Sequence, residues 1–320
     1  RTRGAVLPAG PAADLLTEGA EVNRAPMDYQ HVLQLIDLLE ASSTFSEVLA
    51  TLSLRRVTAA SFVGEQLSAP FNHILGGHVA AQSLIAAAHT VPGRSAHSIH
   101  VYYLRAGDAR YPVDLIVEPA RDGGTLATRK VTARQGDAVL LEALASFSIP
   151  VDSLDYQEPI PDVPEPLSVP TMAEQLAGYA DEHHGFWVRE QPFELRYLDP
   201  HPRLAQDLPD PSSRIRMWWR PTDSVPADPA LHSALLTYLT GTTMLETAMT
   251  PRGAVPAYTF SALIDHALWF HRPVDLSDWV LSDQLSPSGI GGRGLASATM
   301  FNRSGELVCL ATQELYFGHG

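Results

Sequence analysis

The sequence predicts an α+β protein in which one structural unit, a buried helix followed by four antiparallel strands, occurs twice. Two long helical stretches carry almost no charge, and each precedes a run of four strand-like segments. Glycine and aspartate mark several of the turns between these segments, and the two runs keep the same spacing. With 320 residues, of which 45% are apolar, the chain is long enough to bury both units in a large core.

The net charge and the cysteine content restrict the possible binding partners and the cellular compartment. The formal net charge of −14 argues against nucleic acid or an anionic membrane as the main partner, because both would be repelled. The single cysteine, Cys309, allows no intrachain disulfide, which suits the cytoplasm. The sequence shows no run of about 18 apolar residues and no apolar signal-peptide centre, so no membrane span is predicted.

Residues 1–45 are predicted to form an N-terminal extension that is partly disordered, because its first part is rich in alanine, glycine and proline. Apolar residues at helical spacing predict one amphipathic helix in it, over Met27–Leu39. A short helix over Phe45–Leu52 and a strand over Leu54–Gly64 are expected to follow.

The first unit is predicted to cover residues 46–150. Its helix opens at Gly76, Gly77 and His78 and continues through Val79–Ala88 without a charged residue. A helix that is apolar on nearly all sides must be buried, so the following strands are expected to wrap around it. The predicted strands of this unit are Ala96–Leu104, Tyr111–Ala120, Leu126–Gln135 and Ala138–Ile149.

Residues 151–211 are predicted to link the two units. The beginning of this segment is rich in proline and acidic residues, which is typical of an extended and solvated chain. A helix is expected over Thr171–Ala180, and the remainder of the segment has an irregular pattern.

The second unit is predicted to cover residues 212–320 and repeats the order of elements in the first. A strand over Ile215–Arg220 precedes a nearly uncharged helix over Pro229–Ala248, for which Asp228 is the expected N-cap. The predicted strands that follow are Phe260–Phe270, Trp279–Leu285, Gly294–Asn302 and Glu306–Phe317.

The spacing of the two strand runs supports a duplication. Arg105 and Arg272 each end the first strand of a run, and the distances from Arg105 to Ser146 and from Arg272 to Gln313 are both 41 residues. Any two antiparallel runs look alike, but the same element order and the same span favour an internal repeat. Pairing two such sheets side by side would remove exposed sheet edges.

Several motifs of the sequence match those of a known family. The chain resembles bacterial acyl-CoA thioesterase II, a family shared with peroxisomal long-chain acyl-CoA thioesterases, from about Ser46 to Phe317. The resemblance implies a double hotdog, in which two curved antiparallel sheets each wrap one buried helix and join into one continuous sheet. The segments that carry it are Gly76–Gln82, His97–Asp108, Arg121–Gly123, Ala145–Phe147, Ser224–Pro226 and Ile264–Pro273.

The resemblance also implies an activity in lipid metabolism. The family hydrolyses acyl-CoA to a free acid and CoA without metal, separate cofactor or covalent intermediate, so the implied partner is acyl-CoA or another acyl thioester. An Asp, a Thr and a Gln hold the attacking water in the family, and a helix N-terminus, here at Gly76 and Gly77, can polarise the thioester carbonyl. Members of the family commonly associate through their sheets, which implies a homo-oligomer.

Only part of the family's water site carries over to this chain. Gln313 matches the family's Gln, but Gly241 occupies the position of the Asp and Leu263 that of the Thr. A shift of one residue would bring in Thr240 or Thr242, and neither is a carboxylate. The sequence therefore predicts an altered water site.

His78 is the best substitute base in the sequence, because imidazole titrates near neutral pH and the family has Gln at this position. The alternative is a histidine that packs at the start of a helix and bonds to backbone. Glu246 ranks lower, because it lies five residues after Gly241 and off its helical face.

Two further patterns have structural explanations. The segment Gly289–Gly294 reads G-x-G-x-x-G, but it lies between two strands and opens no helix, so it predicts a hairpin and not a dinucleotide site. Its Arg293 is a candidate contact for the phosphates of CoA. The histidine pairs of the sequence lack ligands at metal spacing, so no metal site is predicted.

Two classes of function remain open at this point. Gln313 favours a thioesterase-type hydrolase that works through an altered water site. Gly241 and Leu263 favour a non-hydrolytic protein that binds acyl thioesters, or a biosynthetic enzyme that reuses the hotdog tunnel. Such an enzyme would perform cyclisation, dehydration or acyl transfer on a thioester-linked or polyketide-like chain.

Overall fold

The computed structural model describes residues 44–68, 72–185, 187–189, 191–252 and 261–317. Twelve strands form one continuous antiparallel sheet in the order β1-β2-β4-β5-β6-β3-β9-β12-β11-β10-β8-β7. The first six are β1 (Arg55–Arg56), β2 (Ser61–Gly64), β3 (Ser95–Tyr103), β4 (Val113–Asp122), β5 (Leu126–Gln135) and β6 (Ala138–Ser148). The other six are β7 (Phe193–Tyr197), β8 (Arg214–Pro221), β9 (Ser261–Phe270), β10 (Val280–Ile290), β11 (Arg293–Asn302) and β12 (Leu307–Phe317).

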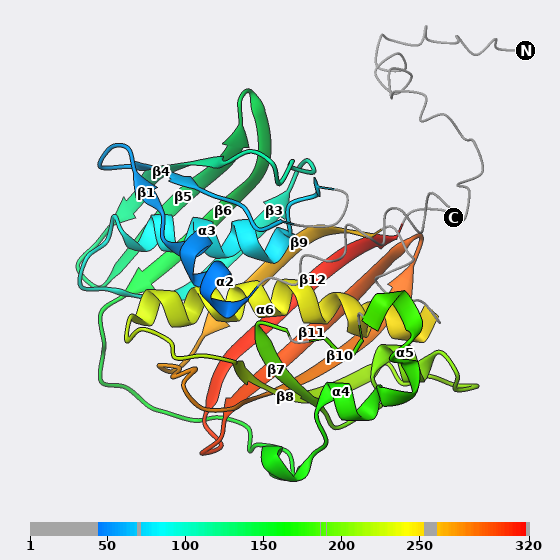
Figure 1. The fold of residues 1–320 in the computed structure, drawn as a ribbon. Helices are drawn as coiled ribbons and strands as arrows, with labels where there is room; N and C mark the ends of the chain where they lie inside the picture. The colour runs from blue at the N-terminus through cyan, green and yellow to red at the C-terminus, as the bar shows by residue number, and fades with distance from the viewer. Residues whose placement is uncertain (1–43, 69–71, 186, 190, 253–260, 318–320) are drawn as a thin grey trace, which may run out of the picture.

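Two long helices, α3 (Gly76–Ala88) and α6 (Pro229–Met249), lie side by side on one face of this sheet (Figure 1). Each contains almost no charge, so burial between sheet and neighbouring helix costs little desolvation. The predicted N-cap is confirmed, because the Asp228 side chain accepts a hydrogen bond from Ala230 N at 3.0 Å. None of the helices in the described part of the chain has the length and apolar character needed to cross a membrane.

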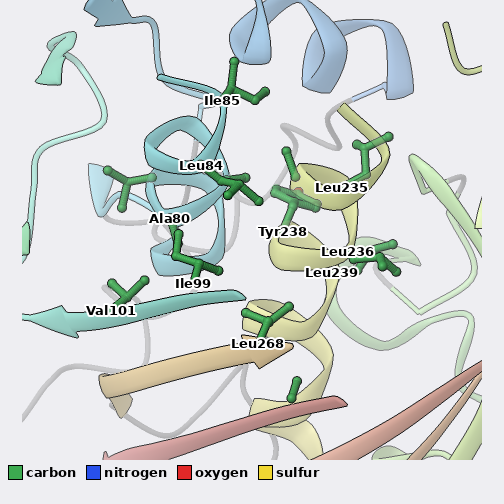
Figure 2. Close-up of a cluster of buried hydrophobic side chains, with 14 of the residues drawn as sticks. Ala80, Leu84, Ile85, Ile99, Val101, Leu235, Leu236, Tyr238, Leu239 and Leu268 are labelled. Carbon is green, nitrogen blue, oxygen red and sulfur yellow. The ribbon is translucent and has the colours of Figure 1, made fainter. Parts of the chain in front are cut away.

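The two units share one core. Figure 2 shows Leu84 of α3 facing Tyr238 of α6, with side chains of the sheet below them. Ile99 on β3 and Leu268 on β9 belong to the same cluster and are fully buried. Burying one such leucine or isoleucine stabilises the fold by about 1.5–3 kcal/mol. The core therefore stabilises the association of the two units as well as each unit.

Strands β3 and β9 join the two units into one sheet. Their antiparallel ladder runs from Ser98 opposite Trp269 to Tyr102 opposite Asp265. With α3 and α6 on one face of the joined sheet, this architecture confirms the predicted double hotdog.

The last strand of the second unit is shifted by one residue relative to the predicted repeat. Arg134 pairs with Val139 in the first unit, whereas Phe301 pairs with Leu307 in the second, so the second turn is one residue longer. The common spacing therefore holds only as far as this turn. Ala145, and not Ser146, is the structural counterpart of Gln313.

The predicted helices and strands of both units are confirmed, apart from small differences at their ends. The predicted strand Leu54–Gly64 is wrong in its middle, because a turn closed by the hydrogen bond from Val57 N to Ser61 O (2.9 Å) separates β1 from β2. The predicted helix Met27–Leu39 lies outside the described residues.

The segment between the units packs along the second unit and contributes strand β7 to the edge of the sheet. The predicted helix Thr171–Ala180 is shorter than expected, because the capping box of Thr171 and Glu174 starts only a single helical turn. The short helices here are η4 (Pro166–Ser168), α4 (Met172–Gln175), η5 (Ala177–Tyr179), η6 (Glu182–Gly185) and α5 (Pro202–Ala205), while α2 (Phe45–Leu52) precedes the sheet and η7 (Thr250–Arg252) follows α6.

Candidate active site

Helices α3 and α6 make their closest backbone approach at Gly77 and Gly241. A Cβ added to Gly77 would lie 2.6 Å from Tyr238 O, and one added to Gly241 would lie 2.9 Å from Gly77 N and against its Cα. Real Cβ atoms do not approach backbone this closely, so neither position accepts a side chain at this helix spacing. The position where the family has an aspartate is therefore filled by the backbone of the other helix.

The N-terminus of α3 lies at this crossing. Leu75 is the N-cap and provides no side-chain hydrogen bond to the first turn. The amides of a first turn have no intrahelical acceptor, and the helix dipole adds partial positive charge there. The Tyr103 hydroxyl donates a hydrogen bond to Gly76 O at 3.0 Å and holds this end of the helix against β3.

A buried histidine and a buried glutamine lie on the strands below the crossing. His266 on β9 and Gln313 on β12 are directly opposite each other in the ladder, and both side chains are 0% exposed. Directly opposed residues of an antiparallel pair project from the same face of the sheet, here the face covered by the helices. The His266 Nε2 lies 3.0 Å from Oγ1 of Thr240 on α6.

The hydrogen bonds of Thr240 define the tautomer of His266. The single hydroxyl proton of Thr240 is donated to Leu236 O at 2.8 Å, so its oxygen is left to accept a hydrogen bond from Nε2–H of His266. Nδ1 of the ring then carries a lone pair. Assigning the proton to Nε2 satisfies every group in this chain of hydrogen bonds.

Three buried polar atoms at this place have no hydrogen-bond partner in the described part of the chain. They are Nδ1 of His266 and both amide atoms of Gln313. Buried polar groups in native proteins are almost always paired, with protein or with ordered water. An acceptor nitrogen beside an amide donor and acceptor is a suitable site for one water molecule or a substrate carbonyl.

Burial keeps the imidazole neutral. Desolvation lowers the pKa of His266 to about 3, so the ring is uncharged at neutral pH and its Nδ1 lone pair is free to accept a proton. The point where a Gly241 Cβ would lie is 2.9 Å from Gly77 N and 3.7 Å from Cε1 of His266. The amide of Gly77 and the ring of His266 therefore lie close to the same point beside α6.

Most of the residues predicted from the sequence come together here. Gly76, Gly77, Thr240 and Gly241 lie at the helix crossing, and Gln313 lies below it on β12.

Leu263 also reaches this place, because a Cβ on Gly76 would lie 2.6 Å from its Cδ1. A bulge in the ladder between β9 and β12 leaves Ile264 without a partner, with Leu263 opposite Leu315 and Asp265 opposite Glu314. The leucine gives the site an apolar wall where the family has a threonine.

Three predicted site residues lie elsewhere. His78 turns toward α2, where its Nε2 lies 2.9 Å from Oγ1 of Thr51, and burial lowers the pKa of His78 to about 4. The Thr242 hydroxyl donates within its own helix, to Leu239 O at 2.9 Å. Arg293 begins β11 and pairs with Glu314 at 3.0 Å.

His266 is the residue of the candidate site that the sequence analysis did not single out, because it was considered only as part of the segment Ile264–Pro273 that carries the family resemblance. The alternation of inward-facing and outward-facing side chains along β9 could have identified His266. His266, Leu268 and Phe270 share the inward face, which places a titratable side chain in a core position directly opposite Gln313. A polar residue at such a position calls for a functional explanation.

Only one of the two units carries these polar groups. The counterpart of His266 in the first unit is Ile99, and the residue opposite it is Ala145. Both are fully buried and apolar. Within the described residues the first unit therefore has no counterpart of the His266–Gln313 pair, and the site lies between the units and uses elements of both.

The fold and this site define a double-hotdog protein with unpartnered buried polar groups near the N-terminus of a buried helix. Residues 191–316 match the family described as acyl-CoA thioesterase, and residues 67–148 match its N-terminal domain. Acyl-CoA thioesterase 2 of Haemophilus influenzae is 31% identical over 85% of this chain and 97% of its own length. The chain belongs to the acyl-CoA thioesterase family, as the motifs of the sequence predicted.

Solved structures agree with this assignment. A tesB protein of Mycobacterium avium subs paratuberculosis is 44% identical, with a TM-score of 0.73 over 86% of this chain and 100% of that one. The acyl-CoA thioesterase II TesB2 of Mycobacterium marinum is 34% identical, with a TM-score of 0.70 over 85% of this chain and 98% of that one. The similarity therefore extends over both hotdog units.

Proposed function

We propose that this chain hydrolyses acyl-CoA through a water molecule held between His266 and Gln313, with the first-turn amides of α3 polarising the thioester carbonyl. Thioester hydrolysis is the activity of the family to which the chain belongs, and the chain is a hydrolase. The observation that carries the mechanism is the set of three buried, unpartnered polar atoms of His266 and Gln313 beside the start of α3.

In the proposed reaction, Nδ1 of His266 takes a proton from the water as its oxygen attacks the thioester carbon. The oxyanion forms toward the amide of Gly77, and Thr240 keeps accepting the hydrogen bond from Nε2–H of His266. The tetrahedral intermediate then collapses, the C–S bond breaks, and the proton on Nδ1 passes to the departing thiolate. The products are the free acid and the CoA thiol.

The low pKa of His266 is compatible with this role. Imidazolium is unfavourable at this buried position, but in the proposed reaction it forms together with a nearby oxyanion. Opposite charges attract strongly in a medium of low dielectric constant, so the developing oxyanion raises the basicity of Nδ1 when the proton is transferred. The proposed chemistry draws on side chains and backbone of this chain and on no metal or cofactor.

The mechanism is tested by thiol release from a series of acyl-CoA thioesters. His266→Asn should lower kcat by about 10²–10⁴-fold, the range expected for loss of a general base. Gln313→Ala should lower kcat by about 10²–10³-fold, as is typical for a lost positioning group. Binding of acyl-CoA, measured by calorimetry, should change little in either variant.

His78→Asn is the matched control, because His78 is buried equally well but faces Thr51 of α2. It should retain kcat within a few-fold of the wild-type value. Loss of activity in His78→Asn with full activity in His266→Asn would overturn the assignment of the base. Tight acyl-CoA binding by the wild-type protein without any thiol release would instead favour the non-hydrolytic thioester-binding protein.

We also propose that the protein works in the cytoplasm. The single cysteine, Cys309, is fully buried, and burial raises the pKa of its thiol, so it stays protonated and unreactive. Such a chain needs no oxidising compartment to fold. Cell fractionation with an antibody to the protein checks this, and recovery in the membrane fraction would contradict it.

The face of the sheet opposite the helices supports association with a second copy. Tyr102 is 60% exposed and Leu144 is 50% exposed there, next to the edge-to-face pair of His100 and Trp269 (ring centroids 5.1 Å apart). A homo-oligomer formed through this face would cover these side chains. Light scattering should give a dimer or larger species for the wild type and a monomer for Leu144→Glu.

A further inference from the structure

The glycine-rich hairpin between β10 and β11 holds an arginine in a fixed position. The guanidinium of Arg252 stacks on Phe317, with its central carbon 4.2 Å from the ring centroid. Its Nη2 donates a hydrogen bond to Arg293 O at 2.7 Å. A Cβ on Gly289 would lie 3.2 Å from this Nη2, and one on Gly294 would lie 2.8 Å from Cε2 of Phe317.

These contacts explain the G-x-G-x-x-G pattern, which the dinucleotide interpretation could not. Gly291 and Gly292 have φ of 59° and 74°, the left-handed conformation that a tight hairpin turn requires. Gly289 and Gly294 have ordinary φ but leave room for the Arg252 guanidinium and the Phe317 ring. Gly291 and Gly292 therefore allow the turn, and Gly289 and Gly294 leave space for the Arg252 and Phe317 side chains.

The charge of Arg252 is not neutralised within the described residues. No carboxylate in that part of the chain forms an ion pair with it, although the net charge of the sequence is −14. The neighbouring Arg293 pairs with Glu314 and is 48% exposed at its side chain. A guanidinium that is fixed in place and lacks a counter-charge is well suited to bind a phosphate group.

The distance from the candidate active site fits the substrate. Gln313 and Phe317 lie on the same face of β12, four residues apart, which corresponds to about 13 Å at roughly 3.3 Å per residue. In CoA, a chain of two amide-linked units joins the sulfur to the first phosphate. Its backbone has about the length of four extended amino-acid residues, or again roughly 13 Å.

We infer that Arg252, assisted by Arg293, binds a phosphate group of the CoA moiety while the thioester lies at His266 and Gln313. The inference rests on the proposed function and adds a binding site for the phosphate groups of the CoA moiety. Arg252 then distinguishes CoA thioesters from thioesters that carry no phosphate, such as those of pantetheine. Arg252 is a binding residue and takes no part in the chemical step.

Steady-state kinetics of Arg252→Gln with two substrates test this inference. An acyl-CoA and the pantetheine thioester of the same acid differ only by the phosphates and the nucleoside. For acyl-CoA, KM should rise about tenfold or more, because a hydrogen bond between charged groups contributes about 1.5–3 kcal/mol. For the pantetheine thioester KM should not change, and kcat should stay within twofold for both substrates.

Arg303→Gln is the matched control, because Arg303 is an exposed arginine that pairs with Glu165 near the turn between β11 and β12. It should leave both KM values unchanged. Equal changes in KM for the two substrates in Arg252→Gln would overturn the inference.

A binding measurement separates this inference from the proposed hydrolysis. Adenosine 3′,5′-bisphosphate, which carries phosphates of CoA but no thioester, is titrated calorimetrically into wild-type protein, Arg252→Gln and Arg252→Lys. Wild type should bind it, Arg252→Gln should bind it about tenfold more weakly or not at all, and Arg252→Lys should be intermediate. Equal affinities of the three proteins for adenosine 3′,5′-bisphosphate would refute the phosphate site, even if hydrolysis is confirmed. If the affinities follow the expected order but the wild-type protein releases no thiol, the phosphate site is supported and the proposed hydrolysis is wrong.

Discussion

Thr240 determines which nitrogen of His266 can act as a base. Its hydroxyl donates to Leu236 O of the same helix and accepts from Nε2–H, so the proton of the ring is held on the side away from Gln313. A threonine in a helix commonly bonds back to its own backbone, which gives this hydroxyl a fixed direction. The positioning of the base therefore follows from a local property of α6.

Thr240→Val removes the acceptor for Nε2–H while keeping the shape of the side chain. We expect kcat to fall about tenfold or more and stability to fall by about 1–3 kcal/mol, because a buried donor loses its partner. Thr242→Val is the matched control, since that hydroxyl bonds only to its own helix, and it should keep nearly full activity. Thiol-release kinetics and urea unfolding measure both effects, and a fully active Thr240→Val would contradict the tautomer assignment.

The sequence predicted both Gln313 and His78 as site residues, and only Gln313 lies at the candidate site described above. Gln313 could be predicted because it lies within a recognisable strand motif. The direction of His78 depends on α2, whose Thr51 binds it, and the role of His266 depends on α6 packing over β9. Such partners are far apart in the sequence, so spacing alone cannot identify them.

The crossing of α3 and α6 is the element that departs most from the family pattern. Gly77 and Gly241 let the helices approach until backbone meets backbone, and the space for a carboxylate disappears. The extent of each helix could be predicted from its lack of charge. The close crossing of the two helices could not be predicted, because it depends on how two segments that are far apart in the sequence pack together.

Gly241→Ala should destabilise the protein by up to about 2 kcal/mol. Its methyl group would press on Gly77, and this overpacking, which costs about 1–3 kcal/mol, exceeds the gain of about 1 kcal/mol from alanine in a helix. Gly178→Ala is the control, because a Cβ there meets no atom within 4 Å, and it should change stability by less than about 0.5 kcal/mol. Unfolding in urea measures both.

Gly241→Asp restores the residue type of the family but should not raise turnover. The carboxylate would be forced into a space occupied by Gly77, and the protein should lose more stability than in Gly241→Ala. An active and stable Gly241→Asp variant would show that the helices can separate to admit the side chain.

Buried histidines make the whole molecule sensitive to acid. Burial lowers the pKa of His78 to about 4 and the pKa values of His201 and His266 to about 3, whereas histidine in an unfolded chain titrates near 6.5. Between about pH 4 and 6.5 the unfolded chain therefore holds up to three protons that the folded chain does not. Smaller shifts in the same direction occur at His89, His97, His232 and His271.

Glu246 has the opposite effect on the number of protons taken up on unfolding. Burial raises the pKa of its carboxyl to about 7, although the hydrogen bond from the Tyr197 hydroxyl at 2.8 Å lowers it, so the folded chain holds one extra proton between about pH 5 and 7. Unfolding at pH 5–6 should thus take up about two protons net. Linkage then predicts that stability falls by roughly 2.7 kcal/mol for each pH unit of acidification in this window.

Urea unfolding at several pH values between 5 and 6 measures this slope. Replacing His78 by Asn should reduce the uptake by about one proton, which isolates the contribution of one side chain. Stability that stays constant or increases toward pH 5 would contradict the prediction.

For the whole molecule, the sequence predicted the duplicated architecture because each unit has the same order of turns and strands. It gave less information about residues 151–211, whose order comes from contacts with the second unit. Trp218 of the second unit, for example, donates its Nε1–H to Pro164 O at 2.9 Å, and within the segment Arg196 donates to Val169 O at 2.6 Å. A proline-rich segment carries no periodic signal that would reveal such contacts.

The placement of one site between both units has a consequence for the synthesis of the protein. Gly77 and Gln313 lie near opposite ends of the described chain, so a ribosome must translate nearly all of it before the site can exist. A nascent first unit has the amide end of α3 but neither histidine base nor glutamine, and its β3 still lacks β9 as a neighbour. Under the proposed mechanism, incomplete translation products therefore have no thioesterase activity.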